Sequence, residues 1–177
     1  MDNPDLIWDP SSHDVIAWGD VVAYKIDKAD LPGVIDRSAA IRDLKQMATK
    51  APQSIRVTPD DALHHNESNV EIVVNDVAGR ALVLFDISGD GTVQTLYPIG
   101  SDPPVIASAE YRLSVRVREP FGADQIVAIT SQQRMTALER ALTQYDQRRS
   151  PEQILQLVQR YAPADARIGS TGLFTAP

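Results

Sequence analysis

The chain has 177 residues, of which 43% are hydrophobic and 23% charged, the composition of a soluble globular protein with one good-sized domain. A formal net charge of −7 argues against binding to nucleic acid or anionic membrane surfaces, which needs clustered lysine and arginine. The absence of cysteine excludes disulfides, thiolate metal sites and cysteine nucleophiles within this chain. No apolar run is long enough to span a membrane, and the acidic start does not have the pattern of a signal peptide. The compartment therefore stays open.

The N-terminal third predicts one extended segment, one β-rich segment and one helix. Residues 1–14 are rich in proline and aspartate, so we expect an extended lead-in whose apolar residues 6–8 are placed to dock on the body. Residues 15–26 are β-rich, and Gly19 marks a bend. After a turn, apolar residues at helical spacing predict an amphipathic helix of about 15 residues that ends before Pro52.

The central part of the chain reads as a series of strands separated by turns. Residues 110–117 alternate apolar and polar side chains, which is typical of a strand with one face in water. Residues 80–87 are almost continuously apolar and predict a central, buried strand. The expected strands in this region are 55–57, 70–76, 80–87, 92–99, 110–117 and 124–131.

The C-terminal part changes to a helical period. A helix is predicted over residues 134–147, with Ser131 as its N-cap, and a second helix begins with Ser150 as N-cap and Pro151 as first residue. A last strand follows at 167–176. The sequence therefore predicts an α+β fold, mainly antiparallel sheet or sandwich with about six or seven strands, one helix in the N-terminal half and two C-terminal helices. We expect residues 15–177 to form a single domain.

The stretch DISGDG raises the question of a calcium site. Asp86, Ser88 and Asp90 occupy the first, third and fifth places of an EF-hand loop, and Gly91 occupies the sixth. However, the twelfth place holds Tyr97 instead of glutamate, and the flanking segments read as strands instead of helices. A β-hairpin turn is the preferred interpretation, because glycine and aspartate tolerate positive φ. Calcium bound by Asp86, Ser88 and Asp90 remains the alternative.

A second polar cluster lies between residues 60 and 67. His64 and His65 are adjacent, so in an extended chain they point to opposite sides and do not chelate one ion. Asp60 and Asp61 lie just upstream, and together these four residues are the only polar cluster dense enough for a hydrolase with a dispersed active site. A solvated loop is the preferred interpretation. The sequence contains neither a G-x-S-x-G elbow nor a phosphate-binding loop.

The segments GRALVLFDISGDGTVQTLYP and PFGADQIVAITSQQRM carry a resemblance to a family of uncharacterised domains found C-terminal to bacterial caspase-like peptidases of the metacaspase and orthocaspase type. The resemblance covers about residues 70–145, and the segment ARIGSTGLFTAP resembles the C-terminal end of such proteins. Each matching residue also has a structural explanation in a turn or at a strand end, so the motif points to maintenance of the fold. The matching residues are Asp90, Gly91, Leu96, Tyr97, Pro98, Pro120 and Gly122.

The resemblance implies a non-catalytic accessory, regulatory or protein-interaction domain of a larger caspase-like protein. The expected partner is the protein's own caspase-like catalytic domain or an external protein, with no nucleic acid and no membrane insertion. We expect no enzymatic activity of the chain itself, because a caspase needs a cysteine, and we expect no cofactor. A metal- or small-ligand-responsive module that uses the turn from Asp86 to Asp90 or the loop from Asp60 to Glu67 is the alternative, and the small hydrolase is a second one. Oligomeric state and the identity of the partner stay open.

Overall fold

The computed structural model describes residues 6–177. Strands dominate the central part of the chain, and the three α-helices lie on either side of it in the sequence. In chain order the elements are β1 (Ile7–Asp9), β2 (Asp14–Ala17), β3 (Asp20–Ala23), a 3₁₀ turn (Lys28–Asp30), α1 (Leu31–Ala48), β4 (Ile55–Thr58), β5 (His64–His65), β6 (Asn69–Asn75), β7 (Arg80–Ile87), β8 (Thr92–Tyr97), β9 (Val105–Ile106), β10 (Glu110–Arg116), β11 (Gly122–Ser131), α2 (Thr136–Tyr145), β12 (Arg148–Arg149), α3 (Pro151–Tyr161) and β13 (Arg167–Ala176).

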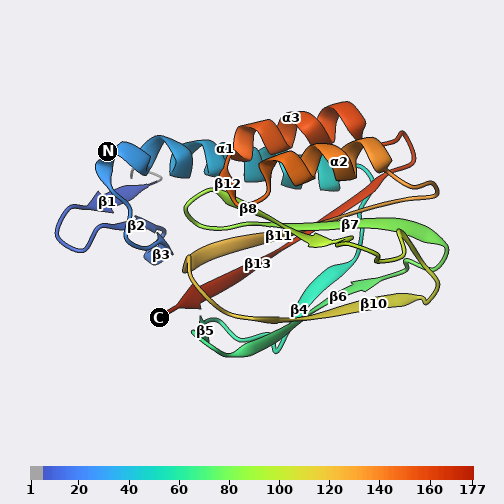
Figure 1. Ribbon diagram of the computed structural model, residues 1–177. Helices are drawn as coiled ribbons and strands as arrows, with labels where there is room; N and C mark the ends of the chain where they lie inside the picture. The colour runs from blue at the N-terminus through green and yellow to red at the C-terminus, as the bar shows by residue number, and fades with distance from the viewer. Residues whose placement is uncertain (1–5) are drawn as a thin grey trace.

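The fold has three layers. Figure 1 shows the helices over one face of a large sheet and a small sheet of β4, β6 and β10 beneath the other face. The large sheet has ten strands, with the order β1-β2-β3-β11-β7-β8-β12 along its main path. β13 pairs with β11 and β5, and β9 pairs with β7. The pairing of β11 with β7 and β13 is antiparallel, so the expected α+β class with a mainly antiparallel sheet is confirmed.

Alternation along β7 and β11 divides the apolar side chains between two cores. Val83, Phe85 and Val127 point to the helices, where they meet the apolar faces of α1, α2 and α3. Leu84 and Ala128 point the other way and pack against the small sheet. Side chains of this kind contribute about 1.5–3 kcal/mol each when fully buried. The two-sided burial explains why residues 80–87 read as a continuous apolar run.

Several sequence predictions are corrected by the structure. The expected count of about six or seven strands is too low, because short strands such as β5, β9 and β12 join the large sheet. Ser131 does not cap α2, which begins at Thr136 after Met135; Ser131 ends β11, and its hydroxyl donates to Asp165. Ser150 does precede Pro151 at the start of α3, but its side chain makes no capping hydrogen bond.

The N-terminal segment packs on the edge of the large sheet. Residues 1–5 of the expected lead-in lie outside the described residues, while β1 pairs with β2. Trp8 docks on the body, its indole N–H donating to the carbonyl of Ile26 at 2.9 Å. Gly19 has φ of +93° in the turn between β2 and β3, where the bend was expected. Within residues 6–177, no helix combines the length and apolar character needed to cross a membrane.

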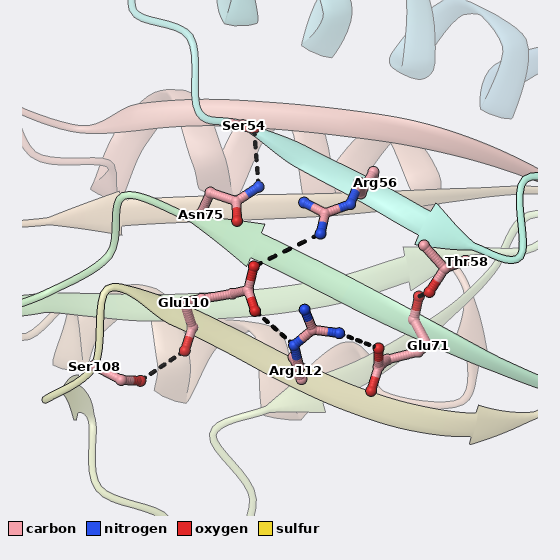
Figure 2. A network of polar contacts seen from close by, with 8 residues as sticks. All are labelled: Ser54, Arg56, Thr58, Glu71, Asn75, Ser108, Glu110 and Arg112. Atoms are coloured by element: carbon pink, nitrogen blue, oxygen red, sulfur yellow. Dashed lines mark hydrogen bonds and ion pairs between the residues drawn. The ribbon is translucent and has the colours of Figure 1, made fainter.

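The outer face of the small sheet is a polar ladder. Arg112 on β10 lies between Glu110 and Glu71 and contacts both carboxylates at 2.5 Å, as Figure 2 shows. Arg56 on β4 reaches Glu110 at 3.6 Å. The charged side chains on this face therefore pair with one another. The other face of β10 borders the cleft that holds the candidate site.

Candidate functional site

The turn between β7 and β8 is a hairpin in which the candidate calcium ligands have protein partners. The hydroxyl of Ser88 donates to Asp86 Oδ2 at 3.1 Å. Asp90 accepts the backbone N–H of Thr92 at 2.9 Å and an Arg149 N–H at 3.2 Å. The oxygens of Asp90 are thus occupied by protein donors, unlike those of a free EF-hand ligand. Over residues 6–177, no group of three or more histidine, cysteine, aspartate or glutamate residues is placed to hold a metal ion.

Arg37 holds the hairpin at the point where β7 separates from β11. The last residue pair of these two strands is Gln125 and Ile87, and β3 takes the place of β7 beside Gly122. Arg37 comes from α1, is only 6% exposed, and donates from Nε to the carbonyl of Ser88 at 2.9 Å and from a terminal nitrogen to that of Ala123. The guanidinium therefore joins the hairpin, where the Ser88 carbonyl also accepts the Gly91 N–H, to the start of β11.

Two carboxyl groups lie side by side on the face of the sheet that points away from the helices. Asp86 on β7 is the direct cross-strand partner of Ile126, and Asp124 is two residues before Ile126 on the same strand. Diagonal neighbours of this kind have Cα atoms about 7–8 Å apart, within reach of one another's side chains. Asp86 is 9% exposed. One oxygen of each carboxyl group, Oδ1, is buried and has no hydrogen-bond partner among residues 6–177.

Burial changes the acidity of both groups. Desolvation raises the pKa of Asp86 to about 7, against the weaker effects of Ser88 and Arg37, which favour the charged form. Desolvation also raises the pKa of Asp124 well above its ordinary value, and the neighbouring charge of Asp86 adds to the increase. Two acids with raised pKa and unsatisfied oxygens in one place are a candidate binding or catalytic site.

Both acids line a cleft of about 290 Å³ between the two sheets. One wall is the inner face of β10 and the segment that follows it, and the opposite wall is β8 with the residues of its hairpin. Tyr97 and Tyr111 join the two sheets nearby, with ring centroids 4.7 Å apart. The apolar lining consists of Val70, Ile72, Leu96, Val115, Val117, Ile126 and Leu173.

The cleft lies where the small sheet has an open edge. On the opposite side β4 runs beside β13, whereas among residues 6–177 β10 pairs only with β6. The inward side chains Tyr111, Leu113 and Val115 of β10 are only partly buried, although they pack against the second core. A long edge strand with unpaired backbone groups and half-buried apolar side chains is a surface to which another strand can be added.

The residues that carry the resemblance described above lie around this region and form no reactive group. Gly91 has φ of +89° in the hairpin turn. Gly122 has φ of +139°, and a Cβ there would lie 2.2 Å from the carbonyl oxygen of Val22. Leu96 and Pro120 line the cleft, whereas Tyr97 is buried and its hydroxyl donates to the carbonyl of Pro103. Pro98 directly follows the end of β8.

The second predicted cluster forms a separate pocket. Asp60, Asp61 and the buried His64 line it with residues of β13, whereas His65 is exposed and points away, as the alternation of an extended chain predicts. The sequence analysis missed Asp124 and Arg37. Arg37 falls among the buried positions Val34 and Ile41 of α1, and a charged residue at a core position of a helical pattern was the available signal.

Comparison with known proteins finds no family model and no curated protein that matches this chain. The function therefore has to be argued from the cleft itself.

Proposed function

We propose that this chain is a non-catalytic protein-interaction domain that binds an extended segment of a partner protein along β10, over the cleft. The observation that carries the proposal is the open edge of β10 with its half-buried apolar side chains Tyr111, Leu113 and Val115. An added strand would pair with the free backbone groups of β10 and cover these side chains. The covered area would supply most of the affinity.

Charged side chains line the outer face of β10. Arg112 and Arg116 are exposed there and pair with Glu71 and Glu67 within the domain. A partner segment with small or polar residues at its outward positions would leave these ion pairs in place.

The resemblance to domains attached to caspase-like peptidases adds a specific partner to the proposal. A caspase-like catalytic domain carried by the same polypeptide is the first candidate, and the domain would then regulate the peptidase or present substrates to it. Calorimetry with the two pieces separate tests this pairing directly. Binding accompanied by a change in peptidase activity supports a regulatory role, and no binding at high micromolar concentration directs the search to external proteins.

Amide hydrogen exchange tests the binding surface, whichever partner is used. The probes are short peptides selected from a random library for binding to this chain. At saturation they should slow the exchange of the β10 amides. The amides of β4, at the other edge of the small sheet, should exchange as before. Protection of another surface, with β10 unaffected, would overturn the proposed function.

A metal-responsive module is the second candidate function, favoured by the unsatisfied oxygens of Asp86 and Asp124. Carboxylate oxygens suit calcium, but calcium takes six to eight oxygen ligands, and within residues 6–177 no three acids or histidines are placed to hold one ion. A melting temperature that rises at millimolar calcium and returns with chelator would support this candidate over the first.

A further inference from the structure

We propose that the cleft contains a subsite for a basic side chain of the partner segment, whose N–H groups donate to the free carboxylate oxygens of Asp86 and Asp124. This inference rests on the proposed function and specifies what the bound segment must carry. A lysine or arginine in that segment would pass from the edge of β10 into the cleft.

The first argument is the hydrogen-bonding need of the two acids. Each has one buried oxygen without a donor, and both residues line the same cleft. Their other oxygens are engaged, Asp86 by the hydroxyl of Ser88 and Asp124 by that of Thr175 at 3.4 Å. A buried acceptor without a partner destabilises the protein, so a ligand that supplies the missing N–H groups recovers this free energy.

The second argument is charge. Arg37 is the nearest cation, but its hydrogen bonds go to carbonyls, and no ion pair between residues 6 and 177 joins it to either acid. Asp90 is matched by Arg149, which also reaches Asp30. Burial holds the pKa of both acids above their ordinary values in the free chain, and a bound basic side chain would favour their charged forms and pair with them.

The rim of the cleft does not supply that cation. Arg116 and Arg118, which line the cleft, both pair with Glu67 on the outside of the small sheet. Glu119 pairs with Lys25 at 2.6 Å. The ionic groups at the entrance are thus engaged with one another, whereas the acids at the bottom are not.

The third argument is the shape and chemistry of the walls. Val115 and Val117 on one side and Leu96 on the other give the entrance an apolar lining. Lysine and arginine carry a long aliphatic stem beneath a charged head, so the stem would pack on these walls while the head reaches the acids. A neutral apolar side chain would fill the walls but leave both acids without donors, and an acidic one would add repulsion.

A peptide-display experiment tests the subsite with the full chain. A library of random nine-residue peptides is selected on the wild-type chain and, in parallel, on the Asp86→Asn, Asp124→Asn double variant. The amide side chains keep the shape of the acids and remove their charge. We expect wild-type selection to enrich lysine or arginine at one fixed position among alternating apolar residues, and the double variant to lose only the basic preference.

One selected peptide then gives the affinity. Replacing its basic residue by citrulline, which keeps the shape of arginine without the charge, should weaken binding to the wild-type chain about tenfold or more. The double variant should bind the arginine and citrulline forms equally within about twofold. Agmatine, a free guanidine, should compete only at much higher concentration than the peptide, because it lacks a backbone to pair with β10.

The failures are distinguishable. Enriched peptides without a basic residue, or a basic preference that persists in the double variant, would overturn the subsite and leave the edge-strand proposal intact. Agmatine that binds as tightly as the peptide would reassign the site to a small amine. If no peptide is enriched on either protein, both proposals are wrong.

Discussion

Replacing Asp86 by asparagine should stabilise the protein, and more so as the pH rises. In the folded state, burial raises the pKa of Asp86 from 3.8 to about 7. The unfolded chain releases this proton near pH 4 and the folded chain near pH 7, so the folded state holds more protons between these values. The unfolding free energy of the wild type therefore falls as the pH rises through this window, by up to about 4 kcal/mol for this group. Asparagine cannot ionise, so this loss disappears.

Urea unfolding followed by circular dichroism at pH 5, 6, 7 and 8 measures the effect. At pH 5 the wild type and Asp86→Asn should differ least, and at pH 8 the variant should be more stable by about 2 kcal/mol or more. Part of the pH dependence should remain in the variant, because the pKa of Asp124 is raised too and changes stability in the same direction. Arg37 and Asp90 are the charged groups that act on Asp86, and the charge of Asp86 in turn raises the pKa of Asp124.

The matched control is Asp61→Asn, a change of the same chemistry on an exposed loop, and it should leave stability within about 0.5 kcal/mol at every pH. Equal pH slopes for the wild type and Asp86→Asn would show that Asp86 titrates normally. A variant that is less stable than the wild type at pH 8 would show that the carboxylate is needed in the folded state. Either result would refute the reasoning.

Three further outcomes are expected. Gly122→Ala should lower the free energy of unfolding in urea by about 3 kcal/mol or more, because the added Cβ would lie 2.2 Å from the carbonyl oxygen of Val22. The control Gly172→Ala, where an added Cβ meets nothing within 4 Å, should fold normally. Equal stabilities of the two variants would contradict the close packing at Gly122. Arg37→Met should cost about 2 kcal/mol, because the Ala123 carbonyl loses its guanidinium donor and the Ser88 carbonyl keeps only the Gly91 N–H, while Arg42→Met, exposed on the same helix, should be close to neutral. Millimolar calcium should leave the melting temperature unchanged, since Asp90 is occupied by Arg149; a clear increase would restore the calcium alternative.

Much of the fold could be predicted because its long elements have strong patterns. The expected strand at 167–176 coincides with β13, and the expected strand at 80–87 coincides with β7. Short strands such as β5 and β12 could not be predicted, because two residues carry no period and their pairing depends on tertiary neighbours. The same limit explains why the large sheet has more strands than expected.

The candidate site could be predicted only in part. Asp86 was singled out for the spacing of a calcium loop, but its importance in the structure comes from Asp124, which is distant in sequence and diagonal to it across β7 and β11. No local pattern connects two such residues, because their proximity depends on strand register. Polar residues are more closely spaced in the loop of Asp60 and His64, but these two residues line a different pocket.

A carbon NMR titration of the Asp86 carboxyl group, in the free chain and with a saturating basic peptide, tests the proposed cleft most directly. The Asp86→Asn variant assigns the signal. We expect a pKa near 7 in the free chain. With the peptide bound, the pKa should fall, because the added cation favours the charged carboxylate. A pKa near 4 in the free chain, or a pKa that stays the same when the peptide binds, would contradict the proposal that Asp86 binds a basic side chain of the partner.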